Sequence, residues 1–161
     1  MVDNAPLWTP TPSRIASSPL TAFMQQASQR AASGFSSYAE LHRWSVEDRA
    51  AFWDLVWDFC GVIGEKGERR LADGDRMPGA SFFPDASLNY AENLLRRKGP
   101  EDAIVFKGED KVLRRLSWDE LHALVSRLQQ LFISVGVKKG DRVAAMMPNM
   151  PEAVAGMLAA A

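Results

Sequence analysis

The fold of this chain is decided by the stretch from Leu116 to Ala161, which reads LSWDELHALVSRLQQLFISVGVKKGDRVAAMMPNMPEAVAGMLAAA. Ser117 and Glu120 have the spacing of a capping box, which predicts that a helix begins directly after Ser117. Apolar residues then recur at every third or fourth position and form one broad face. Gly136 stands where a helix ends in the left-handed conformation, so an amphipathic helix followed by a tight turn is expected.

A strand and a further helix are predicted after that turn. The residues Arg142–Met147 are mostly apolar, as expected of a strand buried within a sheet. Asn149 is placed to cap a helix that runs to Ala161, with Pro151 and Glu152 in its first turn. A strand, a helix, a strand and a helix in this order predict parallel strands joined by a right-handed crossover.

The last predicted helix has almost no polar face. Val154, Met157 and Leu158 lie along it with several alanines, and Glu152 is its only charged residue. Helices of this composition belong inside a larger body, so we expect the chain to be the beginning of a longer domain. In the chain by itself, we expect these side chains to be exposed, and either to drive self-association or to leave the helix frayed.

The part of the chain before Leu116 contains helix starts, a loop and a hairpin. Residues 1–17 are rich in proline and are expected to be extended. The predicted helix starts are Ser18 before Pro19, Ser37 with Glu40, and Ser45 with Asp48. Residues 62–86 are rich in glycine and proline and predict a surface loop. A helix over Leu88–Lys98 and a hairpin through Ala103–Phe106 and Lys111–Leu113 follow.

The composition is that of an ordinary globular protein, with 47% hydrophobic residues, 24% charged residues and a formal net charge of -1. This charge gives no reason to expect nucleic acid or an anionic membrane as a partner. No apolar run approaches the roughly 18 residues of a membrane span. The single cysteine, Cys60, fits a reducing cytoplasm and is expected to be a buried small hydrophobic residue.

No residue is predicted to be catalytic or to bind a metal. His42 and His122 both lack a second potential ligand three or four residues further along the chain. The stretch Gly61–Gly67 resembles a phosphate-binding loop only superficially, because it lacks a Lys followed by Ser or Thr and follows a helix. An apolar stripe with helical spacing and no interleaved cations comprises Phe52, Trp53, Val56, Trp57 and Cys60, and it favours core packing over a ligand platform.

Six blocks of the sequence resemble the adenylate-forming acyl-CoA synthetases. SWDEL at 117–121, GVKKGDRV at 136–143 and MPNMPEA at 147–153 resemble the opening of the adenylation domain. WSV at 44–46, FFP at 82–84 and LNYAENLL at 88–95 resemble the N-terminal extension of the short-chain members. The last two blocks are most similar to those of acetoacetyl-CoA synthetases.

The resemblance implies an α/β fold, with a helical N-terminal extension over residues 1–99. Residues 100–161 would form the truncated start of the AMP-binding adenylation domain, including its first βαβ portion. It also implies that the complete protein ligates a short acid, acetoacetate above all, to CoA through an acyl-adenylate, using ATP and Mg²⁺. The family's catalytic motifs lie beyond residue 161, so the chain alone is expected to be inactive and to bind none of these cofactors tightly.

The resemblance further suggests a contact with CoA. In short-chain acyl-CoA synthetases, basic residues at the position of Arg97 and Lys98 and the loop that includes Phe83 lie near the CoA nucleotide. A guanidinium suits a 3′-phosphate, and an aromatic face suits adenine. The other interpretation is that these cations end a helix and complement its dipole. The acidic Glu101 and Asp102 close by would weaken phosphate binding.

Two other functions are compatible with the sequence. The chain could be a stand-alone, non-catalytic interaction or regulatory module that shares this region with the synthetases. It could also be the equivalent part of a propionyl- or acetyl-CoA synthetase, since only two blocks distinguish the substrates.

Overall fold

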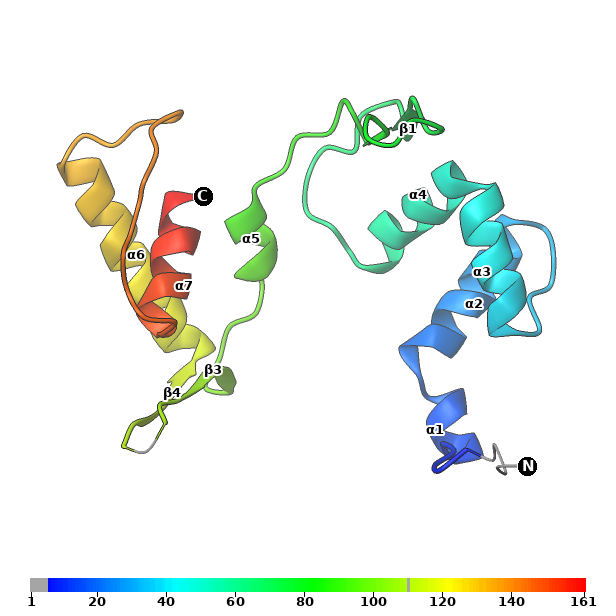
Figure 1. Cartoon of the computed structure of the whole chain (residues 1–161), viewed down its shortest axis with the longest axis horizontal. Helices are drawn as coiled ribbons and strands as arrows, with labels where there is room; N and C mark the ends of the chain where they lie inside the picture. The colour runs from blue at the N-terminus through cyan, green and yellow to red at the C-terminus, as the bar shows by residue number, and fades with distance from the viewer. Residues whose placement is uncertain (1–5, 110) are drawn as a thin grey trace. The chain divides into compact units, whose positions relative to one another are not determined.

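The structure, a computed structural model, describes residues 6–109 and 111–161. The chain divides into two compact units, Met1–Ser87 and Leu88–Ala161 (Figure 1). Each unit has its own hydrophobic core and is described by itself below. The predicted division into residues 1–99 and 100–161 rests on the family resemblance rather than on compactness, and it stays a prediction.

The N-terminal unit begins with helices α1 (Pro12–Ala16), α2 (Pro19–Arg30), α3 (Tyr38–Glu47) and α4 (Arg49–Phe59). The predicted caps at Ser18 and Ser37 are confirmed, and the latter forms a complete capping box. The predicted start at Ser45 is wrong, because Ser45 lies inside α3. Asp48 ends α3 and caps α4 by accepting a hydrogen bond from the backbone N–H of Ala51.

Helix α1 partly corrects the prediction of an extended N-terminal segment. Pro12 occupies the first helical position, where its missing N–H removes no hydrogen bond. The Thr11 side chain accepts from the N–H of Arg14 and so caps this short helix. Residues 1–5 of the same predicted segment lie outside the described residues.

The core of the N-terminal unit lies between α2, α3 and α4. Its buried residues are Phe23, Ala27, Leu41 and Leu55. The ring of Phe23 meets those of Phe52 and Phe59 edge to face, with centroids 5.7 and 5.1 Å apart. Of the predicted stripe, Phe52 and Val56 therefore pack on the core as expected, whereas Trp53 is 42% exposed. Cys60 does not follow the prediction, because it is exposed at the C-terminal cap of α4.

A long loop completes this unit. It carries two short antiparallel strands, β1 (Leu71–Ala72) and β2 (Ser81–Phe82), and an isolated bridge between Glu65 and Ser87. Arg49 of α4 donates to the carbonyl of Gly74 at 2.5 Å, which fixes one end of the loop to the helix. The prediction of a loop over residues 62–86 is therefore correct in outline, and the strands refine it.

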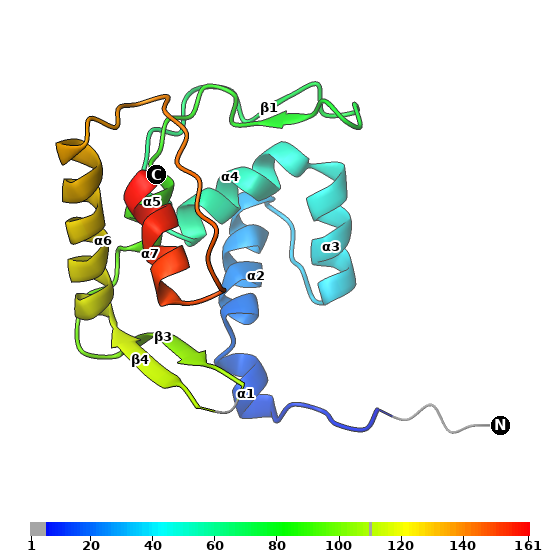
Figure 2. The same ribbon diagram turned by 60° about the vertical axis from the view of Figure 1, so that its left-hand side comes forward.

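The C-terminal unit contains α5 (Tyr90–Leu94), β3 (Asp102–Lys107), β4 (Leu113–Ser117), α6 (Trp118–Ser134) and α7 (Pro151–Ala160) (Figure 2). Strands β3 and β4 form the predicted antiparallel hairpin, with Val105 opposite Arg115, but the second strand lies at Leu113–Ser117 rather than at the predicted Lys111–Leu113. The capping box at Ser117 and the left-handed Gly136, with φ of 84°, confirm the predicted bounds of the amphipathic helix. Helix α5 is shorter than the predicted Leu88–Lys98 helix, because Asn89 caps it and it ends at Leu94.

The predicted strand over Arg142–Met147 is wrong, because these residues are exposed and in no regular structure. A strand needs a hydrogen-bonded neighbour, and among the described residues every ladder pairs other segments and is antiparallel. The predicted parallel pairing is therefore not formed. The cap at Asn149 is also wrong, since Met150 is the N-cap residue and its side chain makes no capping bond.

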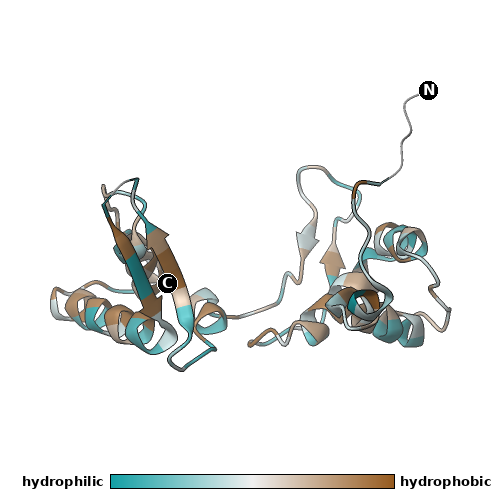
Figure 3. Ribbon diagram, turned by 90° about the horizontal axis from the view of Figure 1, so that it is seen from below, coloured by the Kyte–Doolittle hydropathy of each residue, from teal (hydrophilic) through white to brown (hydrophobic). Residues whose placement is uncertain are grey.

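Helix α7 is better covered than its sequence predicts. It lies beside α6 and α5 (Figures 1 and 2), and Leu158 is only 4% exposed. The core of this unit consists of Ala91, Leu121, Val125, Ala155, Leu158 and Ala159. The expectation that Leu158 is exposed is therefore wrong, although Met157 remains 49% exposed. Both hydrophobic and hydrophilic residues are seen on the helices and strands of the two units (Figure 3).

Candidate functional site

Phe83, a predicted CoA contact, has an unusual backbone conformation. Its φ is 47°, in the left-handed region that residues with a Cβ seldom adopt. The ring is half-buried against Trp57 of α4, with ring centroids 4.9 Å apart, and its N–H donates to the carbonyl of Arg70 at 3.0 Å. Helix α4 and the loop together hold Phe83 in this conformation, and such held strain is found most often at functional positions.

Arg97 and Lys98 lie in the irregular segment after α5, and both are exposed. The ring of His122 on α6 fixes this segment, because its Nε2–H donates to the backbone carbonyl of Arg97 at 2.8 Å. The backbone is thus anchored while the two cationic side chains point to solvent. Since α5 ends at Leu94, the cations lie beyond the helix end, which weakens the alternative that they complement the helix dipole.

The structure brings only part of the predicted CoA contact together. Arg97 and Lys98 are neighbours in the C-terminal unit, whereas Phe83 belongs to the N-terminal unit. Their joint contact with CoA stays a prediction.

Sequence reasoning missed a buried ion cluster around Asp54 on α4. Asp54 is 6% exposed, and its carboxylate accepts from Lys66 Nζ at 2.9 Å and from Arg70 Nε, while Arg30 of α2 pairs with its other oxygen. Asp58, one turn further along, shares Lys66 at 2.5 Å. The signal in the sequence was a carboxylate among the apolar residues of α4, followed by cations in the loop.

A second ion pair joins β4 to α7 in the C-terminal unit. Arg114 donates to Glu152 Oε1 at 2.8 Å, and this hydrogen bond lowers the pKa of Glu152.

A third ion pair lies in the loop of the N-terminal unit. There Arg69 donates to Asp85 through two guanidinium nitrogens, and it lowers the pKa of Asp85 to about 2.

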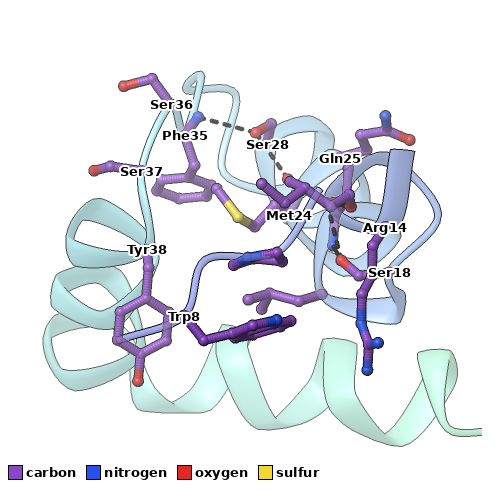
Figure 4. Close-up of a pocket in the computed structure, with 14 residues that line it drawn as sticks. Trp8, Arg14, Ser18, Met24, Gln25, Ser28, Phe35, Ser36, Ser37 and Tyr38 are labelled. Carbon is purple, nitrogen blue, oxygen red and sulfur yellow. Dashed lines mark hydrogen bonds between the residues drawn. The ribbon is translucent and has the colours of Figure 1, made fainter. Parts of the chain in front are cut away.

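A cavity in the N-terminal unit has a volume of about 730 Å³ (Figure 4). It lies between the segment before α1, helix α2 and the residues that lead into α3. The lining residues are Trp8, Pro10, Arg14, Ile15, Ser18, Leu20, Thr21, Met24, Gln25, Ser28, Phe35, Ser36, Ser37 and Tyr38. Figure 4 shows Phe35 and Met24 on one side of it and Trp8 and Tyr38 on the other. Sequence reasoning did not find this cavity, because its walls come from separate elements.

Among residues 6–109 and 111–161, no group of three or more His, Cys, Asp or Glu side chains is arranged to hold a metal ion. No helix in the same residues is long and apolar enough to cross a membrane.

Two family models match consecutive parts of the chain. Residues 38–94 match the acetyl-coenzyme A synthetase N-terminus, and residues 92–161 match the AMP-binding enzymes. The chain belongs to this family of AMP-binding enzymes. The resemblance described from the sequence blocks is thereby confirmed.

Several relatives of the chain are acetoacetyl-CoA synthetases. The chain is 56% identical over all of its 161 residues to the acetoacetyl-coenzyme A synthetase of Rhizobium meliloti (strain 1021), and it covers 25% of that enzyme. It is 35% identical over 132 residues to the acetoacetyl-CoA synthetase of Macaca fascicularis, a match over 78% of this chain and 19% of that enzyme. The chain thus spans about a quarter or less of the length of these relatives.

A solved structure confirms the fold. The acetoacetyl-CoA synthetase from Streptomyces lividans superposes with a TM-score of 0.84 at 39% identity, over 96% of this chain and 25% of that one. The predicted α/β fold of the adenylate-forming enzymes is therefore correct, even though the strand predicted over Arg142–Met147 is not formed.

Proposed function

We propose that this chain is part of an ATP-dependent acetoacetate–CoA ligase. In the proposed reaction the acid carboxylate attacks the α-phosphorus of ATP, which forms an acyl-adenylate and releases pyrophosphate. The thiol of CoA then attacks the acyl carbon, which forms the thioester and releases AMP. The observation that carries the proposal is the 56% identity to the Rhizobium meliloti acetoacetyl-coenzyme A synthetase, which extends over the whole chain.

The relatives also indicate which class of acid the complete enzyme would use as its substrate. Besides the acetoacetyl-CoA synthetases, the chain is 31% identical over 153 residues to the malonamoyl-CoA synthetase of Penicillium aethiopicum. Acetoacetate and malonamate share a carbonyl group one carbon away from the carboxylate, and they differ by a methyl in place of an amino group. We therefore expect a short acid with this second carbonyl, acetoacetate first, rather than acetate or propionate.

The chain's own residues supply scaffold and ligand contacts in this proposal, and none is assigned to catalysis. ATP and Mg²⁺ are ligands of the complete enzyme, and they would supply the activated phosphate and neutralise its charge. Asp54 and its cations hold the Phe83 loop, and the Arg114–Glu152 pair holds α7 against β4.

For CoA, the exposed cations Arg97 and Lys98 fit a phosphate group, since the anchored backbone would present both to it. Phe83 would offer the face of its ring that Trp57 does not cover. Replacing Arg97 and Lys98 by Ala in the complete enzyme should raise the KM for CoA about tenfold, the effect of losing one charged hydrogen bond. The KM for ATP and for acetoacetate should not change.

The control for this substitution is a second pair of adjacent, exposed cations in the same unit, Lys138 and Lys139. Lys138→Ala with Lys139→Ala removes the same charge from the turn after α6 and should leave all three KM values unchanged. A KM for CoA that the Arg97 and Lys98 variant leaves unchanged, or one that both variants raise equally, would contradict the CoA contact.

The proposed activity is testable with a chimeric enzyme in which this chain replaces the matching quarter of the Rhizobium meliloti synthetase. We expect the chimera to catalyse acetoacetate-dependent exchange between ATP and pyrophosphate. The 161-residue chain alone should give no exchange above a protein-free control. A folded chimera without exchange would instead favour a stand-alone, non-catalytic module.

A further inference from the structure

The cavity in the N-terminal unit has the size and lining of a small-molecule site. Its volume of about 730 Å³ lies within the roughly 300–1,000 Å³ typical of ligand pockets. Its walls are mainly apolar, with Trp8, Met24, Phe35 and Tyr38 facing one another across it (Figure 4). An apolar body of drug-like size would therefore fit between them.

Most polar groups in the lining are already used within the protein. Ser28 donates to the carbonyl of Met24 and accepts from the N–H of Phe35. Ser18 accepts from the N–H of Thr21, and the Thr21 hydroxyl donates to a backbone carbonyl. These hydroxyls brace the cavity wall and leave little capacity for a ligand.

Three polar groups of the lining remain available. Within the described part of the chain, the guanidinium of Arg14, the amide of Gln25 and the hydroxyl of Tyr38 have no hydrogen-bonded partner. The guanidinium of Arg14 lies over the ring of Trp8, with its Cζ 5.6 Å from the ring centroid. These groups lie around the apolar walls and can orient the polar end of a ligand.

The charges of the lining favour an anion. Arg14 is the one permanently charged residue among those that line the cavity, and no Asp or Glu is among them. The nearby Glu40 is occupied, because it accepts hydrogen bonds from Ser36 and from the N–H of Ser37. A carboxylate beside Arg14 would thus gain a charged hydrogen bond without facing a competing acid.

From the cavity volume, the apolar walls and the single free cation, we propose that this cavity binds an amphipathic monocarboxylate. The apolar body lies between Trp8 and Met24, and the carboxylate pairs with Arg14. The site belongs to the N-terminal unit alone and does not depend on the ligase activity.

Three ligands with the same apolar chain and different head groups test this assignment. Octanoate, octan-1-ol and octylammonium are titrated into the 161-residue chain, and binding is followed by the NMR signals of the Trp8 indole N–H and the Met24 methyl group. We expect octanoate to bind about tenfold more tightly than octan-1-ol, and octylammonium to bind most weakly, because only the carboxylate pairs with the cation.

Two variants distinguish a ligand that pairs with the charge of Arg14 from one that binds nonspecifically to the apolar walls. Arg14→Gln should bring the affinity for octanoate down to that for octan-1-ol, whereas Arg43→Gln, which removes an exposed cation on α3 outside the lining, should leave it unchanged. Trp8→Ala should lower the affinity for all three ligands, because it removes one wall of the cavity. Equal affinities for the three head groups, an unchanged preference in Arg14→Gln, or no shift of the Trp8 and Met24 signals would overturn the proposal.

Discussion

Replacing Asp54 by Asn removes one negative charge at nearly constant volume, and it should destabilise the N-terminal unit. The carboxylate is buried, whereas the cations around it are partly hydrated: the side chains of Arg30, Lys66 and Arg70 are 42%, 17% and 32% exposed. Breaking a fully buried ion pair costs about 3–5 kcal/mol. Because the cations keep some water and Asn keeps one acceptor, we expect a loss of about 2 kcal/mol.

The assay is urea unfolding followed by tryptophan fluorescence in a Trp118→Phe background. The remaining tryptophans, Trp8, Trp44, Trp53 and Trp57, all lie in the N-terminal unit, so the signal reports that unit. The free energy of unfolding should fall by about 2 kcal/mol in Asp54→Asn, at an unchanged dependence on urea.

Asp58→Asn is the matched control. Asp58 lies one turn further along α4 and shares Lys66 and Arg30 with Asp54, but its side chain is 49% exposed. An exposed pair contributes little, so the control should lose less than about 1 kcal/mol. Equal losses in the two variants, or no loss in Asp54→Asn, would refute the reasoning that the buried carboxylate organises this unit.

Two further predictions concern the two units separately. In the C-terminal unit, Leu158→Ala should cost about 2–5 kcal/mol by leaving a cavity, whereas the half-exposed Met157→Ala should cost far less. The fluorescence of each variant minus that of its Trp118→Phe counterpart during urea unfolding reports this unit, and equal costs would contradict the packing of α7. In the N-terminal unit, Arg69 holds the pKa of Asp85 at about 2, below its ordinary 3.8, so this ion pair stabilises the loop above pH 3.8 and is lost as the pH falls towards 2. An NMR titration of the Asp85 carboxyl should show its pKa rise towards 3.8 in Arg69→Gln, and an unchanged pKa would exclude Arg69 as the cause.

Local signals in the sequence were sufficient for the helix ends. The capping boxes at Ser37 and Ser117 and the terminal Gly136 act through bonds or dihedral angles within a few residues, so their spacing alone places them. Where two possible capping residues lie close together, their spacing alone does not show which of them begins the helix. Asp48 rather than Ser45 begins α4, because α3 continues through Ser45.

Features that depend on distant parts of the chain were not predictable in the same way. The apolar pattern of Arg142–Met147 fits a strand, but forming one requires a neighbour that the pattern does not identify. Leu158 was expected to be exposed, because its cover from α5 and α6 depends on how three helices pack. The Asp54 cluster and the cavity beside Trp8 likewise join elements from separate parts of the N-terminal unit.

The proposal to be tested most directly is that this chain is part of an acetoacetate–CoA ligase. The most direct measurement is kcat/KM for acetoacetyl-CoA formation by the chimera with the Rhizobium meliloti enzyme, beside that enzyme unaltered. We expect the two values to agree within about tenfold, because the chain is 56% identical over all of its 161 residues to the segment that it replaces. A chimera that is folded and binds ATP, yet forms no acetoacetyl-CoA, would contradict the claim.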